Sequence, residues 1–313
     1  MLTRRHLTLL IGAAALLGYT DVAHADEIYV PLVSKGFQHQ FWQAVKAGAE
    51  QAAKQYNVKI TFEGPETEAM VDKQIDMLTA ALAKKPSAIG FAALDSKAAI
   101  PLLKKAQAAK IPVVAFDSGV DSDIPLTTAT TDNLAAAGLA ADKMAALIGD
   151  AGDVAVVVHD QTSRTGIDRR DGFLNRMKEK HPKIKIVSVQ YGGGDQLKST
   201  EITKSILQAN PNIKGIFGAN EGSAIGVLNG VRESKKKVVI IGYDSGKRQK
   251  DAILSGEMAG AITQNPVGIG FKTVEAAVKA LKGEKLPKVI DTGFYFYDKS
   301  NINDPKVAAV LYD

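Results

Sequence analysis

Short apolar runs alternate along the chain with amphipathic segments of helical period, and this alternation restricts the fold more than any other feature. It predicts two series of strands, at 27–33, 58–62, 88–91, 113–116 and 126–129, then at 153–158, 184–189, 215–217, 238–241 and 260–263. It predicts helices between them, among others at 41–55, 68–84, 133–148, 166–180, 199–209 and 223–233. Strand and helix in strict alternation are typical of parallel sheets covered on both faces. We therefore expect an α/β fold with two similar halves that meet near 127–133.

Polar residues follow several of these strands at the point where each strand ends. Asp117 follows the fourth strand of the first series, and Asn220, Asp244 and Gln264 follow strands of the second. Open α/β sheets bind ligands beyond the carboxyl ends of their strands. Each of these residues taken alone could equally be a helix N-cap. Because they converge on one cleft, together they favour a ligand site.

Composition excludes several classes of function. The net charge of +5 comes from 39 basic and 34 acidic residues, and no basic run is longer than 235–237, so no nucleic-acid groove is expected. The chain has no cysteine, which excludes disulfides, thiol catalysis and cysteine-based zinc sites. His39, His159 and His181 are too far apart in sequence to suggest a metal signature. The glycines at 192–194 lack the Gly-Lys-Ser/Thr ending of a phosphate-binding loop, and neither a cofactor nor a metal is expected.

Residues 1–25 have the layout of a secretory signal peptide. A basic pair, Arg4-Arg5, precedes an apolar run from Leu7 to Leu17, and Ala23-His24-Ala25 provides a cleavage site after Ala25. The arginine pair also fits twin-arginine export, and a buried N-terminal helix is the alternative to export. No later segment reaches 18 uninterrupted apolar residues. We expect a soluble protein exported to the periplasm.

Seven separated motifs resemble, in order and spacing, those of the type I periplasmic sugar-binding proteins, the solute-binding components of ABC importers. They are FWQAVKAGAEQAAKQYN, IPVVAFDSGV, TTDNLAAAG, DRRDGF, IFGANEGSAIGVLNGV, VVIIGYDSG and GAITQNPVGIGFKTVEAAVKALKGE. The resemblance implies two Rossmann-like lobes with a monosaccharide between them, joined by three crossover strands near 127–133, 264–266 and 291–294. It implies an N-terminal lobe of residues 26–128 plus 265–290 and a C-terminal lobe of residues 129–264 plus 291–313.

The stretch VSKGFQHQFW at 33–42 contains the only tryptophan of the chain. A sugar ring has apolar C–H faces and a rim of hydroxyls, so its site needs flat aromatic surface beside polar groups. Phe41 and Trp42 match the aromatic pair that packs on the ring in the family. His39, and also Gln38, match positions that bind hydroxyls, while Lys35 resembles the lysine that contacts the ring oxygen in the arabinose binders.

The remaining ligand positions implied by the resemblance carry polar or charged side chains: Asp117, Arg169, Asn220, Asp244 and Gln264. Arg170 and Arg164 are alternatives to Arg169. Ser118 stands where the ribose binders have arginine, and Gly194 stands where the family has an extra aromatic residue. One wall of the site is therefore expected to be more open or differently filled.

These features favour a monomeric, non-enzymatic protein that closes on a small neutral sugar or polyol and presents it to a membrane permease. One alternative is the sensing half of a lac-repressor-type regulator, which the export signal and the missing helix-turn-helix oppose. A second is a binder of a non-sugar solute. A third is an exported α/β enzyme, for which no catalytic constellation is visible. The identity of the sugar or polyol is left open, because small differences in hydroxyl groups decide discrimination.

Overall fold

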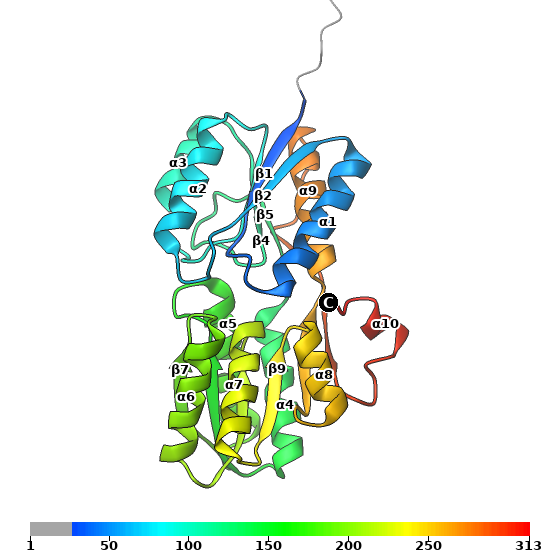
Figure 1. Ribbon diagram of the computed structural model, residues 1–313. Helices are drawn as coiled ribbons and strands as arrows, with labels where there is room; N and C mark the ends of the chain where they lie inside the picture. Colours follow the sequence, from blue (N-terminus) through cyan, green and yellow to red (C-terminus); the bar gives the residue numbers. More distant parts are fainter. Residues whose placement is uncertain (1–26) are drawn as a thin grey trace, which may run out of the picture.

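The computed structural model describes residues 27–313 and shows two lobes stacked end to end (Figure 1). The predicted signal peptide lies outside the described residues. Each lobe is built on a sheet of six strands, in the orders β11-β5-β4-β3-β1-β2 and β12-β10-β9-β8-β6-β7. The predicted α/β fold with two lobes and three crossovers is confirmed.

The first sheet is parallel throughout, and β1 pairs with β2 from Tyr29 opposite Lys59 to Val33 opposite Glu63. Its strands are β1 (Tyr29–Val33), β2 (Lys59–Glu63), β3 (Ile89–Phe91), β4 (Val113–Phe116), β5 (Thr127–Thr130) and β11 (Val289–Asp291). Helices α1 (Gln40–Tyr56) and α9 (Pro266–Leu281) pack on one face, and α2 (Val71–Ala83) and α3 (Ile100–Ala108) pack on the other.

The second sheet is parallel except at one edge, where β12 runs antiparallel to β10. Its strands are β6 (Gly152–Val158), β7 (Ile184–Tyr191), β8 (Ile213–Gly218), β9 (Val239–Tyr243), β10 (Gly260–Gln264) and β12 (Phe294–Tyr297). Its helices are α4 (Asn133–Ile148) and α5 (Arg164–Lys180) on one face, and α6 (Gln196–Ala209), α7 (Glu221–Ser234) and α8 (Lys247–Ser255) on the other. The short helix α10 (Pro305–Ala308) follows β12.

All ten predicted strands are present, and the structure adds one edge strand to each sheet. The alternating pattern does not predict β11 and β12, because they follow each other without an intervening helix and β11 is a three-residue, largely exposed edge. The resemblance implies only a crossover near 291–294, which spans the end of β11 and the start of β12. The lobe boundaries predicted at 128 and 290 fall inside β5 and β11, which pair with the first sheet as far as Thr130 and Asp291.

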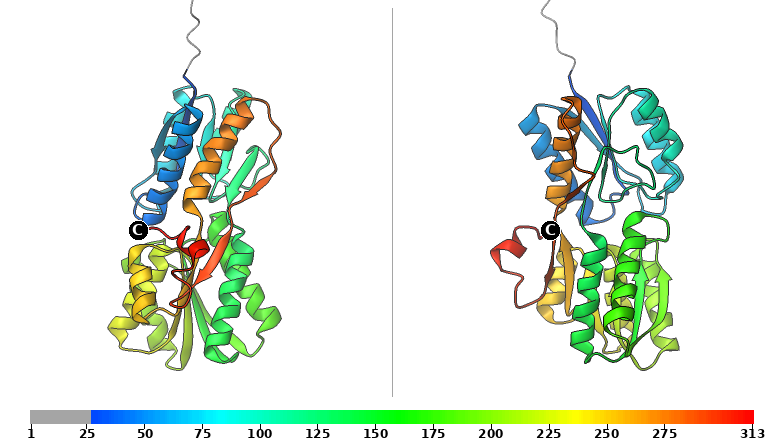
Figure 2. Two further views of the ribbon diagram at one scale, coloured as in Figure 1. Left: turned by 90° about the vertical axis from the view of Figure 1, so that its right-hand side faces the viewer. Right: turned by 180° about the vertical axis from the view of Figure 1, so that it is seen from behind.

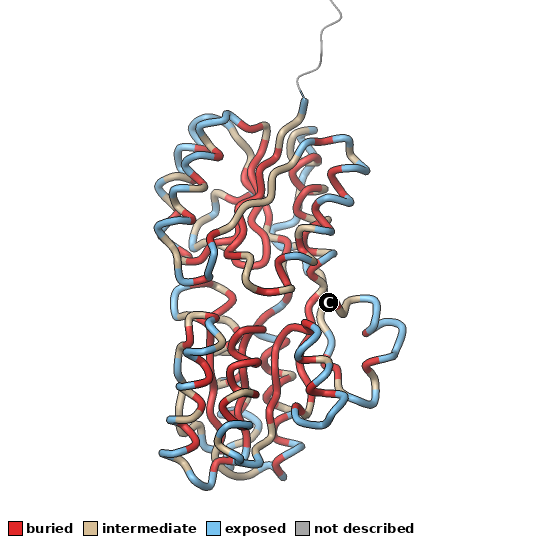
Figure 3. Tube along the Cα trace, viewed as in Figure 1, coloured by how far each residue is buried: buried red, intermediate tan, exposed pale blue. Residues whose placement is uncertain are grey.

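The chain passes between the lobes three times, after β5, after β10 and between β11 and β12 (Figure 2). Buried residues run along the strands of both sheets and continue to the ends that face the other lobe (Figure 3). No helix among residues 27–313 combines the length and the apolar character that crossing a bilayer requires.

Helices α1 and α9, which cover one face of the first sheet, touch each other backbone to backbone. A Cβ atom added to Gly48 in α1 would lie 2.0 Å from the carbonyl oxygen of Val267 in α9. A Cβ atom added to Gly270 in α9 would lie 1.9 Å from the carbonyl oxygen of Val45 in α1. Neither contact can be relieved by a side-chain rotation, so glycine is required at both positions.

We expect Gly48→Ala to lower the free energy of unfolding by about 1–3 kcal/mol, although alanine favours helix by roughly 1 kcal/mol. Gly138→Ala in α4 is the matched control, because the nearest atoms to its new Cβ belong to the flexible end of Arg176, at 3.3 Å or more. Urea unfolding of both variants measures the difference. Equal stability of the two would contradict the close packing of α1 on α9.

Candidate functional site

The nine residues predicted to bind ligand come together around one small closed cavity between the lobes. The cavity left among their side chains measures only about 10 Å³, roughly the room that a single water molecule needs. The lining consists of Lys35, His39, Phe41, Trp42, Asp117, Arg169, Asn220, Asp244 and Gln264, together with Glu68, His159 and Thr165. That these residues bind ligand stays a prediction, whereas the structure does bring them together around one cavity.

The two lobes contribute their aspartates in the same way. Asp117 follows β4 and Asp244 follows β9, each within the sequence Asp-Ser-Gly. Both have left-handed backbones, with φ of 54° and 79°, a conformation that aspartate tolerates better than most residues. Each donates its backbone N–H to the strand that leads to the other lobe, Asp117 to Ala129 at 2.8 Å and Asp244 to Ile262 at 2.6 Å. These bonds point both carboxylates into the junction.

The surroundings of the two carboxylates differ. Asp244 accepts hydrogen bonds from the Gln264 side chain at 2.8 Å and from the Glu221 backbone N–H at 2.9 Å. Asp117 is buried, yet within residues 27–313 its carboxylate oxygens take part in no hydrogen bond. Burial raises the pKa of Asp117 to about 6, although Lys35 and Arg169 act in the opposite direction. Asp117 thus faces the cavity as an acceptor without a protein donor.

Trp42 belongs both to the core of the first lobe and to the wall of the cavity. Its side chain is 1% exposed and packs edge-on against Phe41 and Phe116, with ring centroids 5.0 and 6.3 Å away. Its indole N–H donates to Glu68 at 2.7 Å. The indole is therefore held in one orientation by packing and by a hydrogen bond.

Glu68 was not predicted as a site residue. The helix expected from residue 68 begins at Val71, so Glu68 stays in the loop after β2 and turns toward the cavity. Its backbone N–H donates to the Gln38 side chain at 3.0 Å, and its carboxylate lies 4.0 Å from the Lys35 ammonium. Burial opposes ionisation, but Lys35, the neighbouring histidines and the Trp42 donor together lower the pKa of Glu68 to about 2.

His159 and Thr165 were also missed, and they support Lys35. The Lys35 ammonium donates to the Thr165 hydroxyl at 3.1 Å, and His159 Nε2 lies 3.2 Å from the same hydroxyl. Burial lowers the pKa of His159 to about 3, so its imidazole is neutral at pH 7. The position of His159 directly after β6, at the same edge as the other site residues, is the signal that sequence reasoning could have used.

The structure places Arg169, and neither of its alternatives, in the cavity wall. Its guanidinium donates to Asn133 at 2.8 Å and to the Ala219 carbonyl at 3.0 Å, and stacks 3.8 Å from the Tyr243 ring centroid. Arg164 instead pairs with Asp168, and Arg170 pairs with Asp171, outside the cavity lining.

At Gly194, where the resemblance implies an aromatic residue, the wall of the cavity is formed by polar groups. Gly194 has a left-handed backbone, and a Cβ there would lie 3.1 to 3.4 Å from the side chains of Glu68, Asn220 and His39. Nδ1 of His39 and Nδ1 of His159 are both buried without a hydrogen-bond partner among the described residues. Donors, acceptors and an aromatic face in one enclosed space suit a molecule rich in hydroxyl groups.

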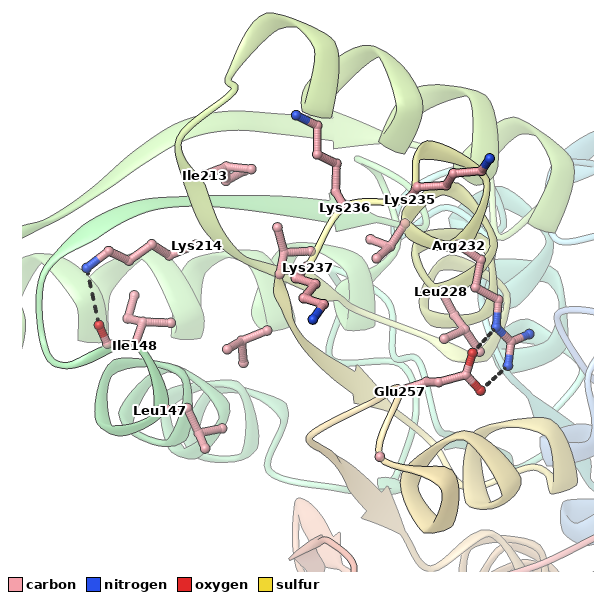
Figure 4. A pocket seen from close by; sticks show the side chains of 14 residues that line it. Leu147, Ile148, Ile213, Lys214, Leu228, Arg232, Lys235, Lys236, Lys237 and Glu257 are labelled. Atoms are coloured by element: carbon pink, nitrogen blue, oxygen red, sulfur yellow. Dashed lines mark hydrogen bonds and ion pairs between the residues drawn. The ribbon is translucent and has the colours of Figure 1, made fainter.

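A larger hollow lies at the far end of the second lobe and has a different character. It is open to solvent and has a volume of about 930 Å³ beside Leu147, Leu228 and the lysines at 235–237 (Figure 4). Its one carboxylate, Glu257, is occupied by a two-fold contact with Arg232 at 2.6 Å. This hollow offers no convergent set of free polar groups of the kind found between the lobes.

Comparison with known proteins places this architecture in a family. Residues 29–285 match the model of the periplasmic binding protein domain. The chain is 29% identical over 268 residues to the D-allose-binding periplasmic protein of Escherichia coli, covering 82% of this chain and 85% of that protein.

Two solved structures are also similar. The carbohydrate transporter solute-binding protein of Agrobacterium radiobacter in complex with D-arabinose shares 34% identity and a TM-score of 0.88, covering 92% of this chain and 99% of that one. The Agrobacterium vitis solute-binding protein with bound D-fucose shares 35% identity and a TM-score of 0.87, covering 91% and 100%. The chain therefore belongs to the family of type I periplasmic binding proteins.

Proposed function

We propose that this protein captures a neutral monosaccharide, or a polyol of similar size, in the periplasm and delivers it to the permease of an ABC importer without altering it chemically. The observation that carries the proposal is the closed cavity in which the fixed indole of Trp42 stands beside the unpartnered carboxylate of Asp117. An aromatic face and a free carboxylate bind the two parts of a sugar, its C–H face and its hydroxyl rim.

The closeness of the lining residues restricts the size of the ligand. Their side chains leave only about 10 Å³ between them, so a ligand enters when the lobes separate, and a small ring is favoured over a longer saccharide. Relatives that bind D-allose, D-arabinose and D-fucose support a pentose or hexose. The signal peptide at residues 1–25 supports export, with cleavage after Ala25. We expect the mature protein to act as a monomer.

Delivery requires that the lobes open and close, and the three crossover segments act as the hinge. A sugar that binds one lobe leaves the polar groups of the other lobe unsatisfied until the cleft closes around it. Closure then signals to the permease that the binding protein is loaded. Lys35, Trp42 and Asp117 come from the first lobe, whereas Arg169, Asn220 and Asp244 come from the second.

We expect the mature protein to bind at least one of D-arabinose, D-fucose, D-allose, D-ribose and D-tagatose with micromolar affinity or better, about −8 kcal/mol or stronger. Binding should raise the melting temperature, and it should change the fluorescence of Trp42, the chain's only tryptophan. Calorimetry gives the affinity. Failure of all five sugars and of a wider panel of polyols would refute a sugar-binding function.

Trp42→Ala should weaken sugar binding by about 1–3 kcal/mol, because the ring contact is lost. It should also destabilise the fold by roughly 3–5 kcal/mol, because the indole belongs to the core. Phe271→Ala in α9 is the matched control, since Phe271 packs against the same core but lies outside the cavity. Urea unfolding and calorimetry on both variants separate the two effects. A similar loss of affinity in both would argue against contact between Trp42 and sugar.

Asp117→Asn should shift the ligand-free protein toward the closed form at pH 7 while weakening sugar binding. In the closed form the pKa of Asp117 is raised to about 6, so its contribution to closure is present below pH 4 and lost as the pH rises through 6. Asparagine avoids this loss, so closure of the variant should gain about 1–3 kcal/mol relative to wild type at pH 7 but not at pH 4. Small-angle scattering of both proteins without sugar at the two pH values measures the closed fraction.

The exposed Asp76→Asn in α2, outside the cavity lining, serves as the control and should leave the closed fraction as it is in wild type. If Asp117→Asn shows the same difference from wild type at pH 4 and at pH 7, the carboxylate is not buried and unpartnered as described.

A further inference from the structure

The N-terminus of α1 is capped by a residue of the other lobe. His39, at the N-cap position, makes no side-chain capping bond. Instead the backbone N–H groups of Gln40 and Phe41 donate to the two carboxylate oxygens of Glu221, at 3.1 and 3.2 Å. Glu221 is the first residue of α7 in the second lobe and lies 181 residues from Gln40 in the sequence. A carboxylate at this point also interacts favourably with the helix dipole.

The second lobe receives a cap in return. Gly246, at the N-cap position of α8, has no side chain that could cap the helix. The N–H of Lys247, the first residue of α8, donates to the side-chain oxygen of Gln40 at 2.8 Å. Residue 40 therefore donates through its backbone to the second lobe and accepts through its side chain from it.

The capping of α1 and α8 by residues of the opposite lobe differs from the capping of most other helices. Five helices of ordinary length receive a hydrogen bond from their own N-cap side chain: α4 from Asp132, α5 from Ser163, α6 from Asp195, α7 from Asn220 and α9 from Asn265. In α1 and α8 the first N–H groups would meet water whenever the lobes separate, because their partners lie across the cleft.

We propose that Glu221 and Gln40 are positioning residues for ligand binding. Together they form an interlobe latch that sets the position of His39, Phe41 and Trp42 over the ligand in the closed state. The inference rests on the proposed function. Neither Glu221 nor Gln40 is among the residues that line the cavity, so the latch acts without touching the ligand.

The latch does not by itself close the cleft. Glu221 is 3% exposed, and burial raises its pKa, with Asp244 acting in the same direction and His39 against it. The desolvation of the carboxylate therefore offsets much of what the two backbone hydrogen bonds contribute. Closure then depends on the ligand, while the latch determines which closed geometry is reached.

Gly246 leaves the room that the latch needs. A Cβ atom there would lie 2.7 Å from the Gln40 side-chain oxygen and 2.9 Å from a Glu221 carboxylate oxygen. The φ of Gly246 is −57°, which alanine adopts without strain, so Gly246→Ala obstructs the latch while the backbone of the second lobe is unchanged.

The test uses Glu221→Ala and Gly246→Ala in the mature chain, with whichever of the five named sugars binds the wild type most tightly. Each variant should raise the Kd at least about ten-fold, chiefly through faster dissociation, because the latch forms after the sugar has entered. Thermal unfolding without sugar should stay close to wild type. Glu233→Ala, at the other end of α7, is the matched control and should bind as wild type does, since Glu233 contacts Lys204 at the surface.

Hydrogen exchange separates positioning from general destabilisation. In the wild type, sugar should slow exchange at the amides of Gln40, Phe41 and Lys247. In Glu221→Ala the sugar should still protect Val45, inside α1, but no longer Gln40 and Phe41. Unchanged affinity in both variants, or protection of Gln40 in Glu221→Ala, would overturn the latch. If the wild type binds no sugar at all, the proposed function fails first and the latch with it.

Discussion

Parallel strands joined by helices bring all of their carboxyl ends to one edge of a sheet, and the whole site depends on this constraint. Lys35 and Asp117 follow β1 and β4 in the first lobe, while Asn220 and Asp244 follow β8 and β9 in the second. Because the two edges face each other, residues remote in sequence surround one cavity. The crossover segments preserve this arrangement, since both aspartates are hydrogen bonded to the strands that lead across the junction.

Closing two polar edges on each other removes charged groups from water, which is unfavourable unless each finds a partner. Glu68 has Lys35 and the Trp42 indole, and Asp244 has Gln264 and a backbone N–H. Asp117 has no donor among the described residues, and its raised pKa expresses the resulting penalty. In the proposed function, a ligand that supplies hydroxyl donors at this point removes that penalty. We therefore expect the imbalance between the two aspartates to make closure dependent on the ligand.

The strand-end residues could be predicted from the sequence because they follow from local patterns: an apolar run, then a polar residue, then a helix. What depended on tertiary contacts could not. Glu68 continues the amphipathic pattern of α2, yet its partners Trp42 and Lys35 hold it in the preceding loop. β11 has no apolar pattern of its own and becomes a strand through its pairing with β5. The capping of α1 by Glu221 of the other lobe could not be predicted either, because nothing in the sequence around Gln40 or Glu221 indicates that the two residues pair.

We expect the selectivity of the proposed site to depend on the side chains near Gly194. No side chain extends from this position, and Glu68, Asn220 and His39 approach the space that one would take. The low pKa of Glu68 makes it an acceptor only, as are the ionised forms of Asp117 and Asp244. Three carboxylates thus face two cations, Lys35 and Arg169, around the cavity. A carboxylate or phosphate on the ligand would add to this excess of negative charge, whereas hydroxyls can donate to every acceptor, so we expect the proposed site to favour uncharged sugars.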